Sequence, residues 1–275
     1  MTDGAPGSIV RSVYPGKSGE PILSAGSFRT SYQSPLAERW GGWYVTGTHG
    51  RQRHMGNATL RGSDPEKLDR EQGANVTDLH SRFDTKRYLT AHSDIVALMV
   101  LEHQVFVHNQ ITIAGYRAML ARSEQEVLNK LDGKPASNPI DSIERRYQWA
   151  GDDVLKCLLM AGEAPLTEAV RGTSGFAEYF ATLGPKDHRG RSLREFDLRK
   201  RLFKYPCSYL IYTEAFQRLP EPLKEYVYKR MWRVLTAQDT ASDFSHLDRN
   251  DRLAIYQILS DTLPELPDYW RTKTP

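Results

Sequence analysis

The sequence has little cysteine: Cys157 and Cys207 are the only two among 275 residues. Neither belongs to a Cys-x-x-Cys pair, so the chain carries no zinc-knuckle, thioredoxin or haem-attachment motif of its own. A free cysteine behaves mainly as a small apolar residue. We therefore expect two buried free thiols.

The sequence also lacks long apolar runs and an excess of charge of one sign. No run reaches the roughly 18–20 apolar residues of a membrane span, so none is expected. The 37 basic and 34 acidic residues leave a formal net charge of +3, too balanced to indicate a nucleic-acid partner. The first residues, Met-Thr-Asp-Gly-Ala-Pro-Gly, have neither the basic nor the apolar region of a signal peptide.

What is present divides into two regions. Residues 1–62 hold more than half of the chain's 20 glycines and show no helical period, which predicts loops and turns with extended pieces at 27–32 and 42–46. From about residue 77 onward the pattern is helical. We expect a mainly α fold, a helical bundle with an N-terminal Gly/Pro-rich β-hairpin and loop segment. Because residues 1–62 make a poor core alone, 1–275 is predicted to be a single domain, with 1–62 packed on a helical body at 77–271.

The clearest predicted helix begins at Ser93 as N-cap, with Asp94 in its first turn, and runs to about Ser123. Its core is apolar nearly all round, which is typical of a helix at the centre of a bundle. Further helices are predicted between the prolines that follow, at 142–162, 175–183, 192–203, 207–218, 221–237 and 248–262.

The central helix carries a cluster of candidate polar residues: Glu102, His103, His108 and Asn109. At about 100° per residue, Glu102 and Asn109 share one otherwise apolar stripe. Burying a carboxylate is unfavourable unless it is paired, so we expect Glu102 to meet an arginine, or a histidine from the N-terminal segment. The four residues are interpreted as a buried polar network, either structural or catalytic. A second Glu-x-x-His motif is absent, which argues against a di-iron bundle.

The most unusual segment is 39–57, which contains two tryptophans, one tyrosine, five glycines, two histidines and a methionine. Glycine lets a backbone approach a flat ligand, and aromatic rings provide apolar walls. Imidazole and thioether groups are ligands of haem iron. The segment therefore offers a candidate cofactor site, with His54 and Met55 as metal ligands, composed of Trp40, Trp43, Tyr44, His49, His54 and Met55. The alternative is a β-hairpin with both tryptophans in the core and surface histidines.

Several long strings resemble a family of largely uncharacterised, exported bacterial c-type-cytochrome-like proteins. They are Arg39-Trp-Gly-Gly-Trp-Tyr-Val-Thr-Gly, His54-Met-Gly-Asn and His92-Ser-Asp-Ile-Val-Ala-Leu-Met-Val-Leu-Glu-His-Gln. In that family a Cys-x-x-Cys-His motif lies upstream of the segment matching the first residues here, and this sequence lacks it. The resemblance implies a periplasmic location, a redox partner protein, and haem c only if an upstream segment supplies the motif; otherwise no cofactor is expected.

Three functions follow as expectations. The first is a haem-associated electron-transfer or redox protein, as a fragment or haem-less member of that family. The second is a haem-free helical binding or scaffold module with a buried Glu/His/Asn network. The third is a hydrolase or metalloenzyme that uses His49, His54 and His103.

Overall fold

The computed structural model describes residues 4–272 and is 44% helical with one small sheet, so the expected mainly α class is confirmed. The α-helices are α1 (Ile95–Leu131), α2 (Asp141–Leu158), α3 (Phe176–Thr182), α4 (Glu214–Gln217), α5 (Glu221–Leu235), α6 (Arg249–Thr262) and α7 (Tyr269–Thr272). The strands are β1 (Arg11–Val13) and β2 (Ser27–Arg29), and short 3-10 helices occupy Leu23–Ala25, Leu36–Glu38, Pro65–Lys67, Thr85–Arg87, Tyr209–Tyr212 and Ser242–Phe244.

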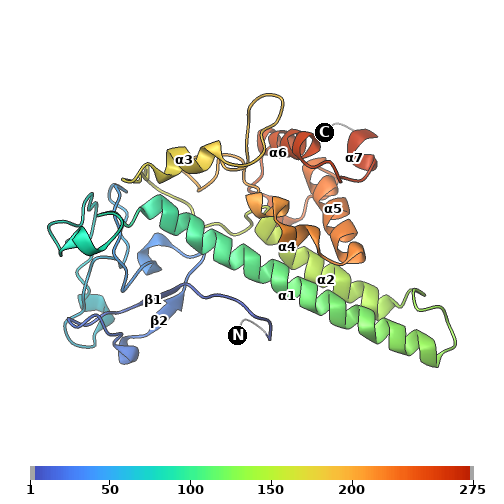
Figure 1. The fold of residues 1–275 in the computed structure, drawn as a ribbon, viewed down its shortest axis with the longest axis horizontal. Helices are drawn as coiled ribbons and strands as arrows, with labels where there is room; N and C mark the ends of the chain where they lie inside the picture. The colour runs from blue at the N-terminus through green and yellow to red at the C-terminus, as the bar shows by residue number, and fades with distance from the viewer. Residues whose placement is uncertain (1–3, 273–275) are drawn as a thin grey trace.

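The long helix α1 organises the molecule (Figure 1). It pairs lengthwise with α2, α5 packs on α2, and α6 packs on α5. The N-terminal segment gathers around the beginning of α1, while the turn between α1 and α2 projects at the opposite end. Residues after α2 contact the N-terminal segment, where Thr48 forms a β-bridge with Arg171.

Asp94 is the N-cap of α1, so the sequence-based assignment of Ser93 as N-cap is wrong by one residue. One oxygen of Asp94 accepts from the N–H groups of Val96 and Ala97, at 2.8 and 3.3 Å. The other accepts from the backbone of Thr173 and from the backbone and hydroxyl of Ser174. A carboxylate has acceptors enough for both tasks, whereas a serine hydroxyl does not.

α1 continues to Leu131, beyond the predicted end near Ser123. Residues 122–130 are mostly strong helix formers. The first residues that interrupt them are Gly133, in the left-handed region at φ 66°, and Pro135. The helix therefore ends where its first breakers occur.

Two predicted helices are wrong, and in both cases short polar side chains bind the backbone locally. Within 192–203, the Asp197 carboxylate accepts from the N–H groups of Arg199 and Lys200 at 2.8 and 2.7 Å, which forms a turn. Within 207–218, Ser208 caps a 3-10 helix and the backbone at Thr213 is extended before α4 begins. Such side-chain bonds compete with helical ones.

The predicted strand at 42–46 is also wrong. The Asn57 side chain accepts from Val45 N–H at 2.8 Å and donates to Val45 C=O at 2.7 Å, so an amide side chain takes the place of a neighbouring strand. Only Thr46 forms a bridge, with Asp94. The other extended piece is confirmed in part as β2, which pairs antiparallel with β1.

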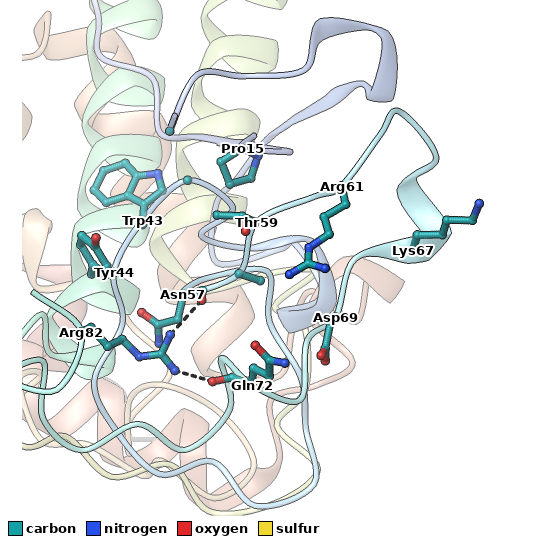
Figure 2. A pocket seen from close by; sticks show the side chains of 13 residues that line it. Pro15, Trp43, Tyr44, Asn57, Thr59, Arg61, Lys67, Asp69, Gln72 and Arg82 are labelled. Atoms are coloured by element: carbon teal, nitrogen blue, oxygen red, sulfur yellow. Dashed lines mark hydrogen bonds between the residues drawn. The ribbon is translucent and has the colours of Figure 1, made fainter. Parts of the chain in front are cut away.

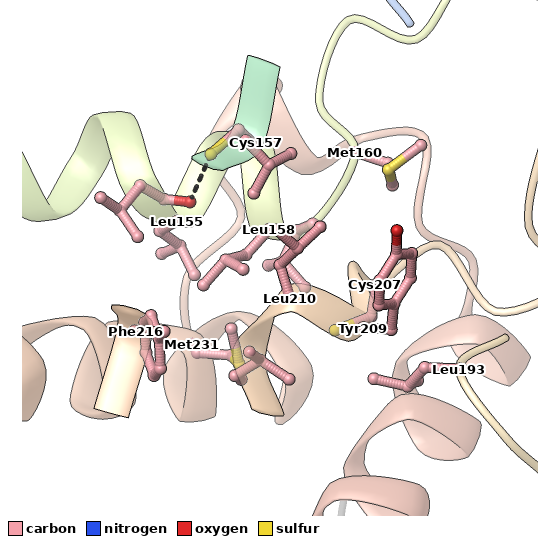
Figure 3. Close-up of a cluster of buried hydrophobic side chains, with 14 of the residues drawn as sticks. Leu155, Cys157, Leu158, Met160, Leu193, Cys207, Tyr209, Leu210, Phe216 and Met231 are labelled. Atoms are coloured by element: carbon pink, nitrogen blue, oxygen red, sulfur yellow. Dashed lines mark hydrogen bonds between the residues drawn. The ribbon is translucent and has the colours of Figure 1, made fainter. Parts of the chain in front are cut away.

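One buried apolar cluster joins the helices to Tyr32, Trp40 and Val45 of the N-terminal segment. Cys157 and Cys207 lie in this cluster as free thiols, as expected from the sequence, and burial raises the pKa of both. Figure 3 shows them among leucine, methionine and aromatic side chains contributed by α2, α4, α5 and the segments between α2 and α5. The division of the chain into domains stays a prediction.

Replacing Asp94 by alanine should lower the free energy of unfolding by about 2–4 kcal/mol, because a helix cap and the buried acceptor that holds the Thr173–Ser174 loop are lost together. Urea unfolding followed by circular dichroism measures this. Ser93→Ala is the matched control and should change stability by less than about 0.5 kcal/mol. Equal losses in the two variants would contradict the assignment of Asp94 as the cap.

Candidate functional site

A tight turn at Trp40 brings the aromatic segment against β1. Trp40 has φ 65°, an unusual value for a bulky residue, and Trp43 N–H donates to its carbonyl at 2.9 Å. A Cβ on Gly41 would lie 2.0 Å from the Val13 carbonyl oxygen, so only glycine fits there. The turn buries Trp40 and leaves Trp43 and Tyr44 beside the surface.

Beyond this turn lies a cleft of about 720 Å³ (Figure 2). Its side chains come from the β1–β2 loop, the turn at 42–44, and the stretches 57–61, 67–72 and 82. The lining residues are Pro15, Gly19, Gly42, Trp43, Tyr44, Asn57, Ala58, Thr59, Arg61, Lys67, Asp69, Gln72 and Arg82. Trp43 and Tyr44 are thus the two sequence-predicted site residues that line it.

Trp43 and Tyr44 form an aromatic wall of the cleft, and neighbouring residues hold both side chains in place. The Trp43 indole N–H donates to the Arg11 carbonyl at 2.9 Å. The Tyr44 ring lies against Phe83, with ring centroids 4.6 Å apart, yet Tyr44 remains 48% exposed. These contacts leave a fixed indole and a partly uncovered phenol at the cleft.

Four charged side chains line the rest of the cleft, a set that the sequence analysis missed: Arg61, Lys67, Asp69 and Arg82. Arg82 donates to the backbone carbonyls of Asn57 and Gln72 and to no carboxylate among the described residues. Arg61 forms no ion pair within residues 4–272, and Figure 2 shows its guanidinium directed toward the middle of the cleft. Lys67 points outward, with its ammonium 3.8 Å from Asp64. Arg61 and Arg82 thus outnumber Asp69, the one carboxylate of the lining, so the cleft carries a net positive charge.

The two histidines of the segment lie together but outside this cleft. The rings of His49 and His54 have centroids 4.7 Å apart. His49 Nδ1 bonds the Gln52 carbonyl at 2.8 Å and Nε2 accepts from Asn75 N–H at 3.0 Å. His54 Nδ1 accepts from Gly56 N–H at 3.0 Å. Burial lowers the pKa of His49 and brings that of His54 to about 3, so both are neutral near pH 7.

These side chains, as arranged, do not fit a haem. Both nitrogens of His49 are engaged, and the fully buried sulfur of Met55 accepts from the Ser12 hydroxyl at 3.6 Å in a separate apolar cluster. The cleft is lined by no histidine, methionine or cysteine. The assignment of His54 and Met55 as metal ligands stays a prediction.

The polar residues of α1 make three separate contacts and not one network. Glu102 pairs with Arg39 at 3.2 Å, with both side chains almost completely buried, which satisfies the expectation of an arginine partner. His103 Nε2 bonds the Ser208 hydroxyl at 2.9 Å. The Asn109 amide exchanges hydrogen bonds with the backbone of Ser8.

His108 does not belong to this buried set, because it lies on the exposed face of α1. Its position about 140° around the helix from His103 accounts for this difference. His103 itself lies between the rings of Tyr32, Phe203 and Tyr209. Desolvation alone lowers its pKa to about 3, so it is a neutral, buried histidine.

Histidines 49, 54 and 103 do not converge on a metal position. Among the described residues, only Asp187, His188 and Asp261 place three ligand atoms within 4.8 Å of one another. Asp187 there already accepts from Arg191 Nε at 2.7 Å and from two backbone N–H groups. Its charge is therefore compensated without a metal ion.

No protein-family model, curated protein or solved structure matches this chain. The resemblance to c-type-cytochrome-like proteins stays a prediction. None of the helices described in residues 4–272 has the length and apolar character needed to cross a membrane.

Replacing His103 by glutamine should make stability less sensitive to acid. The folded-state pKa of about 3 lies below the ordinary value of 6.5. The unfolded chain therefore binds an extra proton as pH falls below about 6.5, and the wild type loses stability that the variant keeps. When the pH falls from 7 to 5, the free energy of unfolding of the wild type should decrease by about 2 kcal/mol more than that of the variant.

Urea unfolding at both pH values measures this shift. Other titrating groups, including Glu102, whose burial raises its pKa to about 7, are common to both proteins and cancel in the comparison. His108→Gln, on the exposed face of the same helix, is the control and should follow the wild type. A parallel pH dependence for wild type and His103→Gln would contradict a neutral His103.

Proposed function

We propose that this protein is a binding module whose N-terminal cleft takes a small ligand with a flat ring and an anionic group. One observation carries the proposal: the cleft places the Trp43–Tyr44 wall opposite the unpaired guanidinium of Arg61. This shares with the second expectation from the sequence, a haem-free helical binding or scaffold module with a buried Glu/His/Asn network, only the idea of binding, because the cleft lies in the N-terminal segment and contains none of those residues.

The cationic side supports an anionic ligand. Guanidinium groups bind carboxylate and phosphate with two parallel hydrogen bonds. Arg82 is oriented by the carbonyls of Asn57 and Gln72, so its charge is fixed without being neutralised. Arg61 is free to close on the ligand.

The aromatic side supports a flat group. Tyr44 is fixed from behind by Phe83 and the Trp43 indole by Arg11. Aromatic rings favour offset or edge contacts with other rings. A bound ring therefore needs little rearrangement of this wall.

In this proposal the helical part is a bundle that acts as a scaffold. α1 and α2, with α5 packed on α2, provide the large buried core. The N-terminal segment, with only a small apolar cluster of its own, is held against it by Arg39, Trp40 and Val45. Binding and stability are thus served by different parts of the chain.

A haem-associated redox function remains a separate proposal, with a narrower basis. Haem is flat and carries two carboxylates, which suits the cleft wall and its arginines. Its iron ligands would have to come from outside the cleft lining. We therefore treat haem as one possible ligand and assign no electron-transfer step.

The test is a titration of the protein with flavin mononucleotide, riboflavin and haemin, followed by tryptophan fluorescence. Flavin mononucleotide and riboflavin share a ring and differ by the phosphate. We expect flavin mononucleotide to bind at least about ten-fold more tightly than riboflavin, and Arg61→Gln to remove most of that difference, because a charge-assisted hydrogen bond is lost.

Arg145→Gln is the matched control, since Arg145 is also exposed and forms no ion pair among the described residues, but lies on α2. It should bind as the wild type does. Equal binding of the two flavins, or no binding of flavin mononucleotide and haemin, would contradict the proposal. A haemin spectrum with axial imidazole or thioether ligation would instead favour the haem-associated function.

A further inference from the structure

The second half of α1 carries an uncovered apolar stripe. Its side chains are between 44% and 79% exposed: Tyr116, Met119, Leu120, Val127 and Leu131. At about 100° per residue these five lie within about 120° of one another around the helix. Ser123 and Lys130 are the polar residues within the same sector. An exposed apolar surface of this kind marks an interaction site.

The stripe continues a face that is covered in the first half of the helix. There, Glu102 is buried against Arg39 and Asn109 against Ser8. After Ile113, which is 3% exposed, the N-terminal segment no longer covers this face. α2 packs on the opposite side, along Ala114, Ala118 and Ala121. The α1–α2 pair projects from the body at this end, so the stripe is open to a partner (Figure 1).

The spacing within the stripe is symmetric. Leu120 and Val127 are equally far from the point between Ser123 and Glu124, and so are Tyr116 and Leu131. A two-fold axis through that point, perpendicular to α1, would place Leu120 opposite Val127 of a second copy and Tyr116 opposite Leu131. Isologous interfaces have this self-complementarity, in which the same surface serves both partners.

The flanks of the stripe fit the same arrangement. Arg122 and Glu126 lie on one edge, on either side of the axis, and form an ion pair with each other at 3.0 Å. In the antiparallel pair each would also lie beside the opposite charge of the second copy, so two such pairs would join into one group of four alternating charges. Glu124 lies beside the axis on the other edge, where its charge is already compensated by Arg146 of α2. Antiparallel helices also align their dipoles favourably.

From this self-complementary face we propose that the protein forms a homodimer through antiparallel packing of the second half of α1. The occupant of the stripe is a second copy of the same chain. Each copy contributes the same apolar side chains, and the N-terminal clefts lie at the far ends of the pair.

Sedimentation velocity of the full chain between about 1 µM and about 1 mM tests the association. The wild type should shift from monomer to dimer within this range. Leu120→Glu combined with Val127→Glu should raise the dissociation constant at least about ten-fold while leaving the melting temperature unchanged, because both positions are exposed in the monomer. Leu89→Glu, at another fully exposed leucine, is the control and should dimerise like the wild type.

Cysteine crosslinking tests the direction of packing. A mixture of Leu120→Cys and Val127→Cys proteins should form a mixed disulfide on mild oxidation. Leu120→Cys alone should not, because in the antiparallel pair its two copies lie about 10 Å apart along the helix, beyond the reach of a disulfide of roughly 7 Å. The native thiols are buried and do not interfere.

A monomer at every concentration would overturn the proposal and assign the stripe to a different partner. Crosslinking of Leu120→Cys to itself would overturn the antiparallel arrangement. Dimerisation that survives the double glutamate substitution would place the interface elsewhere.

Discussion

The ion pair between Arg39 and Glu102 joins the two parts of this protein. Arg39 donates to Glu102 at 3.2 Å and also to the carbonyls of Tyr32 and Ser34, so nearly all of its donors are used. Burial opposes both charges: it raises the pKa of Glu102 to about 7 and lowers that of Arg39. Each ion is tolerated in the core because the other is present, so the N-terminal segment and α1 must fold against each other.

The cleft is a consequence of this attachment. Beside the buried guanidinium, Trp40 turns the chain with its left-handed backbone, and Met55 N–H donates to the Arg39 carbonyl at 2.9 Å. The turn delivers Trp43 and Tyr44 to the cleft. The positions of Trp43 and Tyr44 thus depend on the buried contacts of Arg39 and Trp40 with the helical core, although most residues of the cleft are exposed.

The sequence predicts those features of the structure that depend on local chemistry and on the periodicity of apolar residues. A long apolar period specifies α1, although the predicted cap is one residue early, and the cost of a lone buried carboxylate anticipates an arginine or histidine partner for Glu102. The helix predicted at 192–203 is wrong because the carboxylate of Asp197 accepts hydrogen bonds from the backbone that follows it and forms a turn. The arginines of the cleft were not predicted, for another reason. Arg61 and Arg82 stand in ordinary polar stretches of the sequence, and only the tertiary fold brings them into one cleft with Trp43.

A double-mutant cycle on Arg39 and Glu102 tests the central claim most directly. Arg39→Met, Glu102→Met and the double variant would be compared with the wild type by urea unfolding at pH 7. If the pair holds the two parts together, each single variant loses about 3–5 kcal/mol because it leaves one buried charge alone. The double variant then loses much less than their sum. Single losses below about 1 kcal/mol, or losses that simply add, would contradict the account.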